Sequence, residues 1–306
     1  MDKGLHFISG LPRAGSTLLA AILRQNPNLH AGMSSPMAGL FQRAIRGMGP
    51  ENEFATLITD AQRRNVLRAL FDGFYQEIHP NQLVIDTNRV WCSKLPAIAE
   101  LFPEARVIVC VRPLPWVLDS FERALRKNPL MVSKMFKPKD GGGSTVYTRI
   151  AALSSGNGSV GFAWNAVQEA FYGEHANRLI VVEYEALARE PQRTIELLYQ
   201  ALRLPSFEHD FDNVVYDEGS EFDSRLGVPG LHAVNRKVSF IERPTILPPD
   251  LFERFAGRNF WRRPGGNPHN VTVILPTVLK EPGSKARPAQ ATKTPYGWRR
   301  GPMAGL

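Results

Sequence analysis

One short stretch near the start of the chain constrains the fold more than any other: residues 7–23 read FISGLPRAGSTLLAAIL. The pattern predicts a buried strand that leads through a glycine-bearing turn directly into a helix. Gly10 and Gly15 enclose four residues and are followed by Ser16 and Thr17, the spacing of a phosphate-binding loop with serine in place of lysine. Such a turn directs backbone N–H groups and the positive end of a helix toward an anion. An incidental glycine turn before a helix is the alternative interpretation.

The rest of the chain alternates between apolar runs of strand length and segments with helical periodicity. We expect strands at 5–9, 82–86, 105–111 and 178–184, and helices at 16–25, 54–78, 93–101, 114–127, 160–175 and 191–203. Strands that alternate with helices favour parallel pairing. The predicted fold class is α/β, a three-layer fold of the phosphate-loop (P-loop) type with a mostly parallel central sheet flanked by helices.

The net charge of +8 is unevenly distributed along the 306 residues. Residues 264–306 contain six Lys or Arg side chains and a single acidic residue, Glu281. This distribution argues against a duplex nucleic-acid binder, whose basic surface would lie on the folded part. We expect one folded domain at 1–263 and a basic, Pro/Gly-rich tail at 264–306 that is disordered or loosely packed. The apolar stretch VTVILPTVL (271–279) is the exception within that tail.

Composition also limits the cofactors and the location. Cys92 and Cys110 are the only cysteines and do not form a pair with metal-ligand spacing, so neither a metal site nor a disulfide framework is expected. No apolar run reaches the roughly 20 residues of a membrane-spanning helix. The first expected strand begins at Leu5, which leaves no room for a signal peptide. These features favour a soluble cytoplasmic protein that binds neither membranes nor nucleic acid.

Arg13 is the only cation in the loop, and this indicates which group binds there. In nucleoside triphosphate enzymes, a loop lysine and a magnesium ion neutralise the charge on the terminal phosphates. A sulfuryl group carries less negative charge than a terminal phosphoryl group, so its transfer has less need of either. Arg13 and the hydroxyl groups of Ser16 and Thr17 could suffice to hold a 5′-phosphosulfate. The loop therefore favours sulfuryl chemistry without a metal ion.

Two stretches resemble the signatures of sulfotransferases that use 3′-phosphoadenosine 5′-phosphosulfate (PAPS). LPRAGSTLL resembles that family's 5′-phosphosulfate loop, and FPEARVIVCVRPLPWVLDSFERALRKNP resembles its 3′-phosphate signature, in which a strand ends in arginine and a serine follows eight positions later. The resemblance implies that Arg112 and Ser120 contact the 3′-phosphate. Arg112 would stand at the carboxyl end of a parallel strand, the usual ligand edge of such sheets. The resemblance also implies loop contacts with the donor from Pro12, Arg13, Ala14, Gly15, Ser16 and Thr17.

Three further fragments resemble the protein-tyrosine sulfotransferase branch of the family. AWNAVQEAF resembles its tryptophan–asparagine helix, and VVEYEALAREPQRTIELLYQALRLP resembles a region whose tyrosine reaches the 3′-phosphate. This implies that role for Tyr184, with a strand-end core tyrosine as the alternative. IDTNRVW resembles a segment in which a lysine after asparagine assists catalysis, and Arg89 stands at that place. Together the fragments cover about residues 5–262, which makes 1–263 the expected sulfotransferase domain.

The catalytic base is where the chain departs from that branch. The tyrosine-sulfating enzymes use a glutamate shortly after the loop helix, whereas this chain reads GMSS at 32–35 and has no carboxylate between Arg24 and Glu51. His232 is the natural substitute, because imidazole accepts a proton near neutral pH. Asp86, at the end of QLVID, is the second candidate. An inert loop histidine is the alternative interpretation of His232.

The complete expectation is a PAPS-dependent sulfotransferase that transfers the sulfuryl group to a hydroxyl or amine acceptor and releases adenosine 3′,5′-bisphosphate. Arg13 and Arg89 would stabilise the oxygens as charge moves toward the leaving phosphate. Lys237, with Arg236, stands where related enzymes supply a late cation to the donor. The expected partner is a small-molecule or peptide acceptor with a hydroxyl group. The sequence indicates neither the identity of that acceptor nor the oligomeric state.

Two other functions remain open: a P-loop nucleotide kinase or hydrolase, and a nucleotide-binding regulatory protein without catalysis. Ser16 in the place of lysine disfavours the kinase, as does the lack of an apolar strand that ends in a magnesium-binding aspartate; IDTN is the nearest match. A sulfate-transfer assay separates the regulatory protein from the enzyme.

Overall fold

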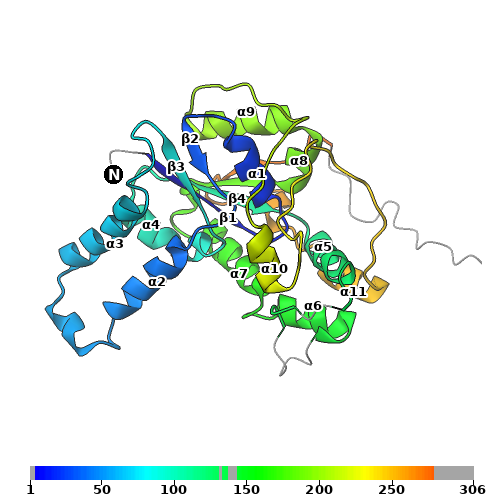
Figure 1. Ribbon diagram of the computed structural model, residues 1–306, viewed down its shortest axis with the longest axis horizontal. Coiled ribbons are helices and arrows are strands. Elements are labelled where there is room, and N and C mark those ends of the chain that lie inside the picture. Colours follow the sequence, from blue (N-terminus) through cyan, green and yellow to red (C-terminus); the bar gives the residue numbers. More distant parts are fainter. Residues whose placement is uncertain (1–3, 131–132, 137–142, 279–306) are drawn as a thin grey trace, which may run out of the picture.

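The computed structural model describes residues 4–130, 133–136 and 143–278. In this part of the chain, parallel strands form a six-stranded sheet in the order β2-β3-β1-β4-β5-β6 (Figure 1). The strands are β1 (Leu5–Gly10), β2 (Leu29–Ala31), β3 (Leu83–Thr87), β4 (Val107–Val111), β5 (Leu179–Glu183) and β6 (Thr272–Ile274). This is the α/β class with the parallel sheet that the sequence predicts.

Helices cover both faces of the sheet, which confirms the three layers. Figure 1 shows α1 and α9 on one side of the sheet and α7 on the other. The α-helices are α1 (Ser16–Leu23), α2 (Met37–Gly47), α3 (Asp60–Phe74), α4 (Leu95–Leu101), α5 (Leu114–Arg126), α6 (Val146–Ser154), α7 (Ser159–Tyr172), α8 (Tyr184–Arg189), α9 (Pro191–Leu202), α10 (Ser220–Leu226) and α11 (Pro249–Phe255). Short 3-10 turns lie at Glu53–Leu57, Trp91–Lys94, Ala176–Arg178 and Phe260–Arg262.

The centre of the sheet is the core of the molecule. β1, β4 and β5 are buried along their whole length, as expected for apolar strands with helices on both faces. β1 lies between β3 and β4, so the carboxyl ends of these three strands meet at one edge. Gly10 ends β1 with φ of 117°, and a Cβ there would lie 2.1 Å from the carbonyl oxygen of Cys110. Only glycine therefore allows β1 to approach β4 at this edge.

The helix expected at 54–78 is in fact two elements. A 3-10 turn (Glu53–Leu57) precedes α3, and Thr59 separates them. The Thr59 hydroxyl accepts a hydrogen bond from the backbone N–H of Gln62, and the Gln62 side chain accepts one from the backbone N–H of Thr59. This capping box starts a new helix, and apolar periodicity does not reveal such a local hydrogen-bond pattern.

The structure corrects the expected boundary at residue 263. β6 lies within the expected tail, pairs in parallel with β5 and forms the edge of the sheet. Val271 and Ile274 are buried against the core, which explains why this apolar stretch folds despite its Pro/Gly-rich surroundings. Residues 279–306 of the expected tail lie outside the described residues. The sequence also predicts a flexible, exposed loop at 137–145, and residues 137–142 of that segment lie outside the described residues as well.

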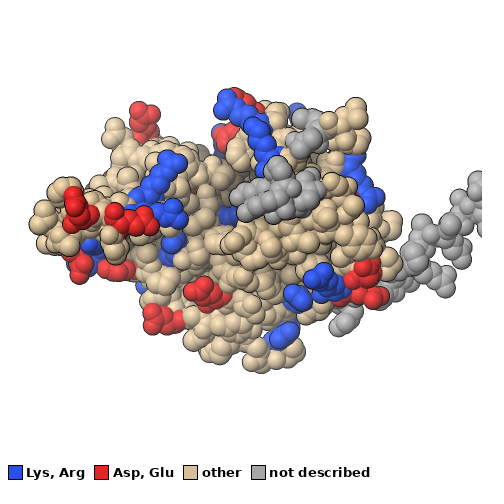
Figure 2. All heavy atoms as spheres, turned by 90° about the horizontal axis from the view of Figure 1, so that it is seen from below, with Lys and Arg blue, Asp and Glu red and all other residues tan. Residues whose placement is uncertain are grey.

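Charged side chains are scattered over the face shown in Figure 2, with Asp and Glu among Lys and Arg. On this face the basic residues do not gather into one continuous surface. Within the described ranges, none of the helices is both long and apolar enough to cross a bilayer.

Candidate functional site

A cavity of about 940 Å³ lies at the carboxyl edge of the sheet, where β1, β3 and β4 end. Its walls include residues of the segment 10–17 between the end of β1 and the start of α1, residues 87–89 at the end of β3, Arg112 after β4 and residues from the segment 230–243. Ligands of parallel α/β sheets bind at this edge, because the loops that carry functional groups all leave the strands there.

The loop after β1 is shaped to receive an anion. Gly15 is the N-cap of α1, with φ of 89°, and a Cβ there would lie 2.8 Å from Cδ2 of Tyr184. No side chain in the described residues caps α1, and its first turn contains no acidic residue. The leading N–H groups of α1 are therefore left for a ligand. Pro12, Ser16 and Thr17 line the cavity beside this helix end.

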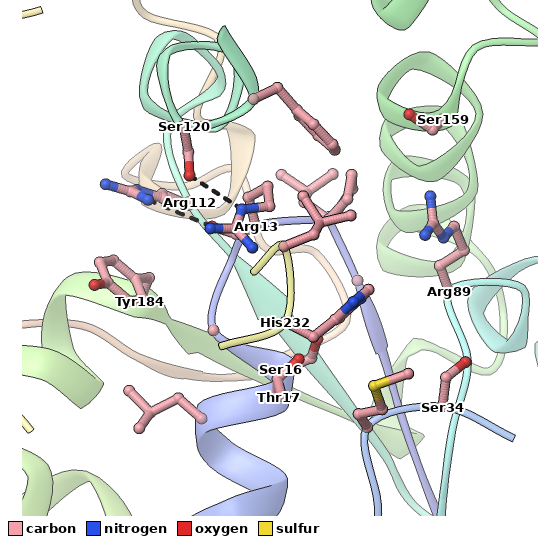
Figure 3. Close-up of a pocket in the computed structure, with 18 of the residues that line it drawn as sticks. Arg13, Ser16, Thr17, Ser34, Arg89, Arg112, Ser120, Ser159, Tyr184 and His232 are labelled. Carbon is pink, nitrogen blue, oxygen red and sulfur yellow. Dashed lines mark hydrogen bonds between the residues drawn. The ribbon is translucent and has the colours of Figure 1, made fainter. Parts of the chain in front are cut away.

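Four of the predicted donor-binding residues meet at one end of the cavity (Figure 3). Nε of Arg13 donates to Oγ of Ser120 at 3.1 Å, and Nη1 of Arg112 donates to the carbonyl oxygen of Arg13 at 3.4 Å. The guanidinium carbon of Arg112 lies 4.4 Å from the centre of the Tyr184 ring, a cation–π contact. The sequence assigns three of these residues to the 3′-phosphate and Arg13 to the 5′-phosphosulfate, and the structure brings all four together.

Burial disfavours the charges at this end of the cavity. Removal from water lowers the pKa of Arg13, and the same cause lowers the pKa of Arg112 to about 10. Arg112 still carries its charge at neutral pH, so two close cations share a poorly hydrated space. An anionic ligand there would offset the cost of their burial.

The cavity wall is cationic as a whole. The described lining residues include no Asp or Glu but six basic side chains: Arg13, Arg89, Arg112, Lys127, Lys237 and Arg243. A cleft lined by charges of one sign concentrates ligands of the opposite sign. Within the described ranges, His, Cys, Asp and Glu do not gather in any group of three that could hold a metal ion.

Arg243 lines the cavity but was not predicted from the sequence. Its Nη2 donates to Oδ2 of Asp119 at 3.0 Å, and Oδ1 of the same carboxylate accepts hydrogen bonds from Thr245 and from the backbone of Ile246. Asp119 is fully buried on α5, next to Ser120. These bonds attach the segment 243–246 to α5. The local sequence gives no sign of this, because the two partners are 124 residues apart.

Two predicted donor contacts lie differently from expectation. Lys237 lines the cavity, but its ammonium group pairs with Asp212 at the surface, 2.8 Å from Oδ1. The side chain of Ala14 packs into the hydrophobic core and is not part of the cavity lining.

Asp86, the second candidate for the catalytic base, does not line the cavity. Its side chain is buried and accepts hydrogen bonds from Ser35 Oγ, the Tyr75 hydroxyl and Trp91 Nε1. Burial raises the pKa of this carboxyl group. A core carboxylate surrounded by donors has a structural role.

His232 lines the cavity and is held by a carboxylate that the sequence analysis missed. Its Nδ1 lies 2.5 Å from Oδ1 of Asp223, and its backbone N–H donates to Oδ2 at 2.8 Å. Asp223 is buried on α10. Because Asp223 accepts from Nδ1–H, the neutral imidazole has Nε2 as its proton acceptor. In Figure 3, His232 lies between Ser16 and Arg89.

Arg89 lies apart from Arg13 although both line the cavity. Figure 3 shows Arg89 beside α7 and Ser159, on the opposite side of the view from Arg13. Burial lowers the pKa of the Arg89 guanidinium. The sequence-based expectation that both arginines stabilise the oxygens as charge moves toward the leaving phosphate stays a prediction.

Comparison with known proteins agrees with this architecture. A family model described as "Sulfotransferase family" matches residues 6–209. Among solved structures, the sulfotransferase domain from the curacin biosynthetic pathway superposes with a TM-score of 0.53 at 18% sequence identity, covering 83% of this chain and 96% of that chain. A sulfotransferase from Alicyclobacillus acidocaldarius gives a TM-score of 0.44 at 17% identity, covering 73% and 89%. No curated protein matches the chain.

Proposed function

This chain belongs to the sulfotransferase family, and we propose that its cavity binds PAPS and transfers the sulfuryl group to a hydroxyl or amine of a small acceptor. The observation that carries the proposal is the meeting of Arg13, Arg112, Ser120 and Tyr184 beside an uncapped helix end. A donor with phosphate groups at both ends of one nucleoside needs two anion sites in one cavity. The released product is adenosine 3′,5′-bisphosphate (PAP).

The 3′-phosphate is assigned to the arginine end of the cavity. The Arg112 guanidinium and the Ser120 hydroxyl would bind its oxygens, while Tyr184 holds Arg112 by the contact between ring and guanidinium. Arg13 extends from the loop to Ser120 and so connects this end to the loop. The buried positive charge makes the pair of arginines a better partner for a dianion than for a neutral ribose.

The 5′-phosphosulfate is assigned to the loop and the start of α1. Ser16, Thr17 and the leading N–H groups of the helix supply donors that do not have to reorganise when charge develops on the oxygens. PAPS itself supplies the activated sulfuryl group. The chain's part is to hold the two ends of the donor and to aim the sulfur at the acceptor.

His232 is proposed to accept the proton of the attacking hydroxyl. Nε2 is the free acceptor nitrogen of the imidazole, and Asp223 stabilises the positive charge that forms on the ring. Asp223 does not line the cavity, so it acts as a positioning residue.

For the acceptor, we propose that this chain is functionally most closely related to the protein-tyrosine sulfotransferase branch. The motifs around Trp164 and Tyr184 support this proposal. The structure adds a qualification to the first of these motifs. Trp164 packs against Phe260 and Trp261 and is not part of the cavity lining. The motif around Tyr184 is therefore the support that remains for a relationship to the protein-tyrosine branch. Because tyrosine has a phenolic hydroxyl, phenols are the first acceptors to assay.

The test is a sulfate-transfer assay with radiolabelled PAPS and a set of phenol, alcohol and amine acceptors, joined to calorimetry with PAP and adenosine 5′-monophosphate (AMP). We expect PAP to bind at least tenfold more tightly than AMP, since hydrogen bonds to charged groups contribute about 1.5–3 kcal/mol each. Equal affinities would remove the 3′-phosphate assignment. Transfer from ATP that stops on addition of EDTA would favour the kinase instead, and PAP binding without any transfer would favour a regulatory protein.

A further inference from the structure

The guanidinium of Arg89 is a charged group without a partner among the described residues. The backbone of Arg89 is fixed, because its carbonyl oxygen accepts a hydrogen bond from Ser9 Oγ at 3.0 Å. Its side chain forms neither a hydrogen bond nor an ion pair with any residue in the described ranges. The side chain is exposed within the cavity, and the surrounding walls lower its pKa. An accessible cation in the cavity wall attracts an anionic ligand.

Two hydroxyl groups in the same cavity wall also lack partners. Oγ of Ser159 and Oγ1 of Thr87 are both enclosed and form no hydrogen bond within the described residues. Thr87 is only 6% exposed, so its hydroxyl cannot be satisfied by bulk water. Because these oxygens have almost no exposed surface, an ordered water within the wall is the partner that would satisfy them.

The start of α7 adds partial positive charge near Arg89 and Ser159. Ser159 is the first residue of α7, and the N-cap, Gly158, provides no side chain. The first turn contains no acidic residue, so the partial positive charge of this 14-residue helix is not neutralised locally. Figure 3 shows Ser159 on this helix with Arg89 in front of it.

We infer that Arg89, beside the start of α7, forms an oxyanion subsite for the acceptor, so that the preferred acceptor carries a carboxylate or a phosphate in addition to its hydroxyl. The inference rests on the proposed function, because it takes the opposite end of the cavity to be the donor site. That end already has its own cluster of Arg13, Arg112 and Ser120. In Figure 3, His232 lies between Arg89 and the cluster of Arg13, Arg112 and Ser120.

The planar guanidinium favours a carboxylate or a phosphate over a neutral polar group, because it forms two parallel hydrogen bonds to two oxygens. These bonds also favour anionic acceptors over acceptors that offer only a neutral group at that place. The subsite would therefore select acceptors as well as hold them.

The experiment titrates the PAP-saturated full-length protein with three phenols: 4-hydroxyphenylacetate, 4-hydroxyphenyl phosphate and 4-ethylphenol. Binding is followed by calorimetry and by ligand-observed NMR. We expect one or both anionic probes to bind the wild-type protein at least tenfold more tightly than 4-ethylphenol. Whether the carboxylate or the phosphate binds more tightly identifies the oxyanion.

Arg89→Gln should abolish this preference, and Arg89→Lys should keep part of it. The matched control is Arg43→Gln, which removes one charge from an exposed arginine of α2 outside the cavity lining and should keep the whole preference. Equal binding of charged and neutral probes by the wild type, including no binding of either, overturns the inference. So does a preference that survives in Arg89→Gln.

Turnover separates this role from a catalytic one. If Arg89 binds the acceptor, Arg89→Gln raises KM for the anionic phenols and removes the difference in KM between them and 4-ethylphenol. If Arg89 instead acts on the sulfuryl oxygens, kcat falls equally for every acceptor. Binding of PAP to the wild type is measured before any phenol is added. If PAP does not bind, the proposed function fails, and this outcome is distinct from a failure of the acceptor subsite.

Discussion

Nδ1 of His232 and Oδ1 of Asp223 are 2.5 Å apart, and the second oxygen of the same carboxylate accepts the backbone N–H of His232. Asp223 thus holds both the ring and the main chain of the histidine. The orientation of the imidazole and the position of its proton are set before any substrate arrives, which lowers the reorganisation that proton transfer requires.

Replacement of Asp223 by asparagine should therefore affect chemistry and not donor binding. An asparagine amide can donate to Nδ1 and so favour the tautomer with the proton on Nε2, which cannot act as a base. We expect kcat to fall by about 10²–10⁴, the range of a lost general base, with the calorimetric affinity for PAP unchanged. Glu221→Gln, an exposed carboxylate on the same helix, is the matched control. An unaltered kcat in Asp223→Asn would assign the base elsewhere.

Arg112→Gln should reduce the affinity for PAP about tenfold or more and leave the affinity for AMP unchanged, because only the 3′-phosphate loses a partner. Arg106→Gln, at the opposite end of β4, should change neither affinity. Calorimetry with both nucleotides gives the answer. A parallel loss of both affinities would mean that Arg112 supports the cavity as a whole.

The affinity for the donor product PAP should also fall at alkaline pH. The pKa of Arg112 is about 10 in the free protein, since burial lowers it, and an anion prefers the protonated form. The affinity for PAP should therefore be constant near neutrality and weaken as the pH rises through about 10, because binding then requires uptake of a proton. A pH titration by calorimetry that remains flat to pH 10.5 would contradict this, provided that circular dichroism shows the protein still folded.

Gly15→Ala tests the loop. The residue has φ of 89°, and its Cβ would lie 2.8 Å from the Tyr184 ring. Strain of about 1–3 kcal/mol is expected, with PAP bound roughly 10-fold more weakly or worse. Gly39→Ala lies in α2 with no atom near its Cβ and should leave binding unchanged while slightly raising Tm. Normal PAP affinity in Gly15→Ala would show that the loop is not in contact with the donor.

Truncation tests the role of β6. Ending the chain after Arg263 removes the edge strand and the buried Val271 and Ile274, so Tm should fall by about 10 °C or more. Ending it after Val278 should keep Tm, because β6 and its pairing with β5 are retained. Thermal unfolding by circular dichroism compares the two. Equal melting temperatures would mean that β6 contributes little to the sheet.

Sequence reasoning succeeded where the determining interactions are local. The strand–loop–helix of 5–23 and the strand that ends at Arg112 are both continuous patterns, and the structure has them as expected. It failed where side-chain hydrogen bonds decide the arrangement. Arg243 is brought to the cavity by its bond to Asp119, 124 residues away. Asp223 is recognisable as a partner only by its bond to His232, in a stretch without strands.

Very short or capped elements were the other source of error. β2 and β6 have three residues each, too few for a periodic signal, and are recognisable only by their pairing with β3 and β5. Tyr184, expected at the end of a strand, is the first residue of α8.

The position of β6 at one edge of the sheet has a consequence for the protein while it is being made. β5 ends at Glu183 and its outer neighbour does not begin until Thr272, so the ribosome must add about 90 residues before the two strands can pair. At typical synthesis rates of about 5–20 residues per second, the outer edge of β5 stays open on the nascent chain for about 5–20 s. An unpaired apolar edge of that kind can pair with another chain. Polysome crowding and slow translation of 184–271 are thus the conditions under which this protein is most exposed to misassembly.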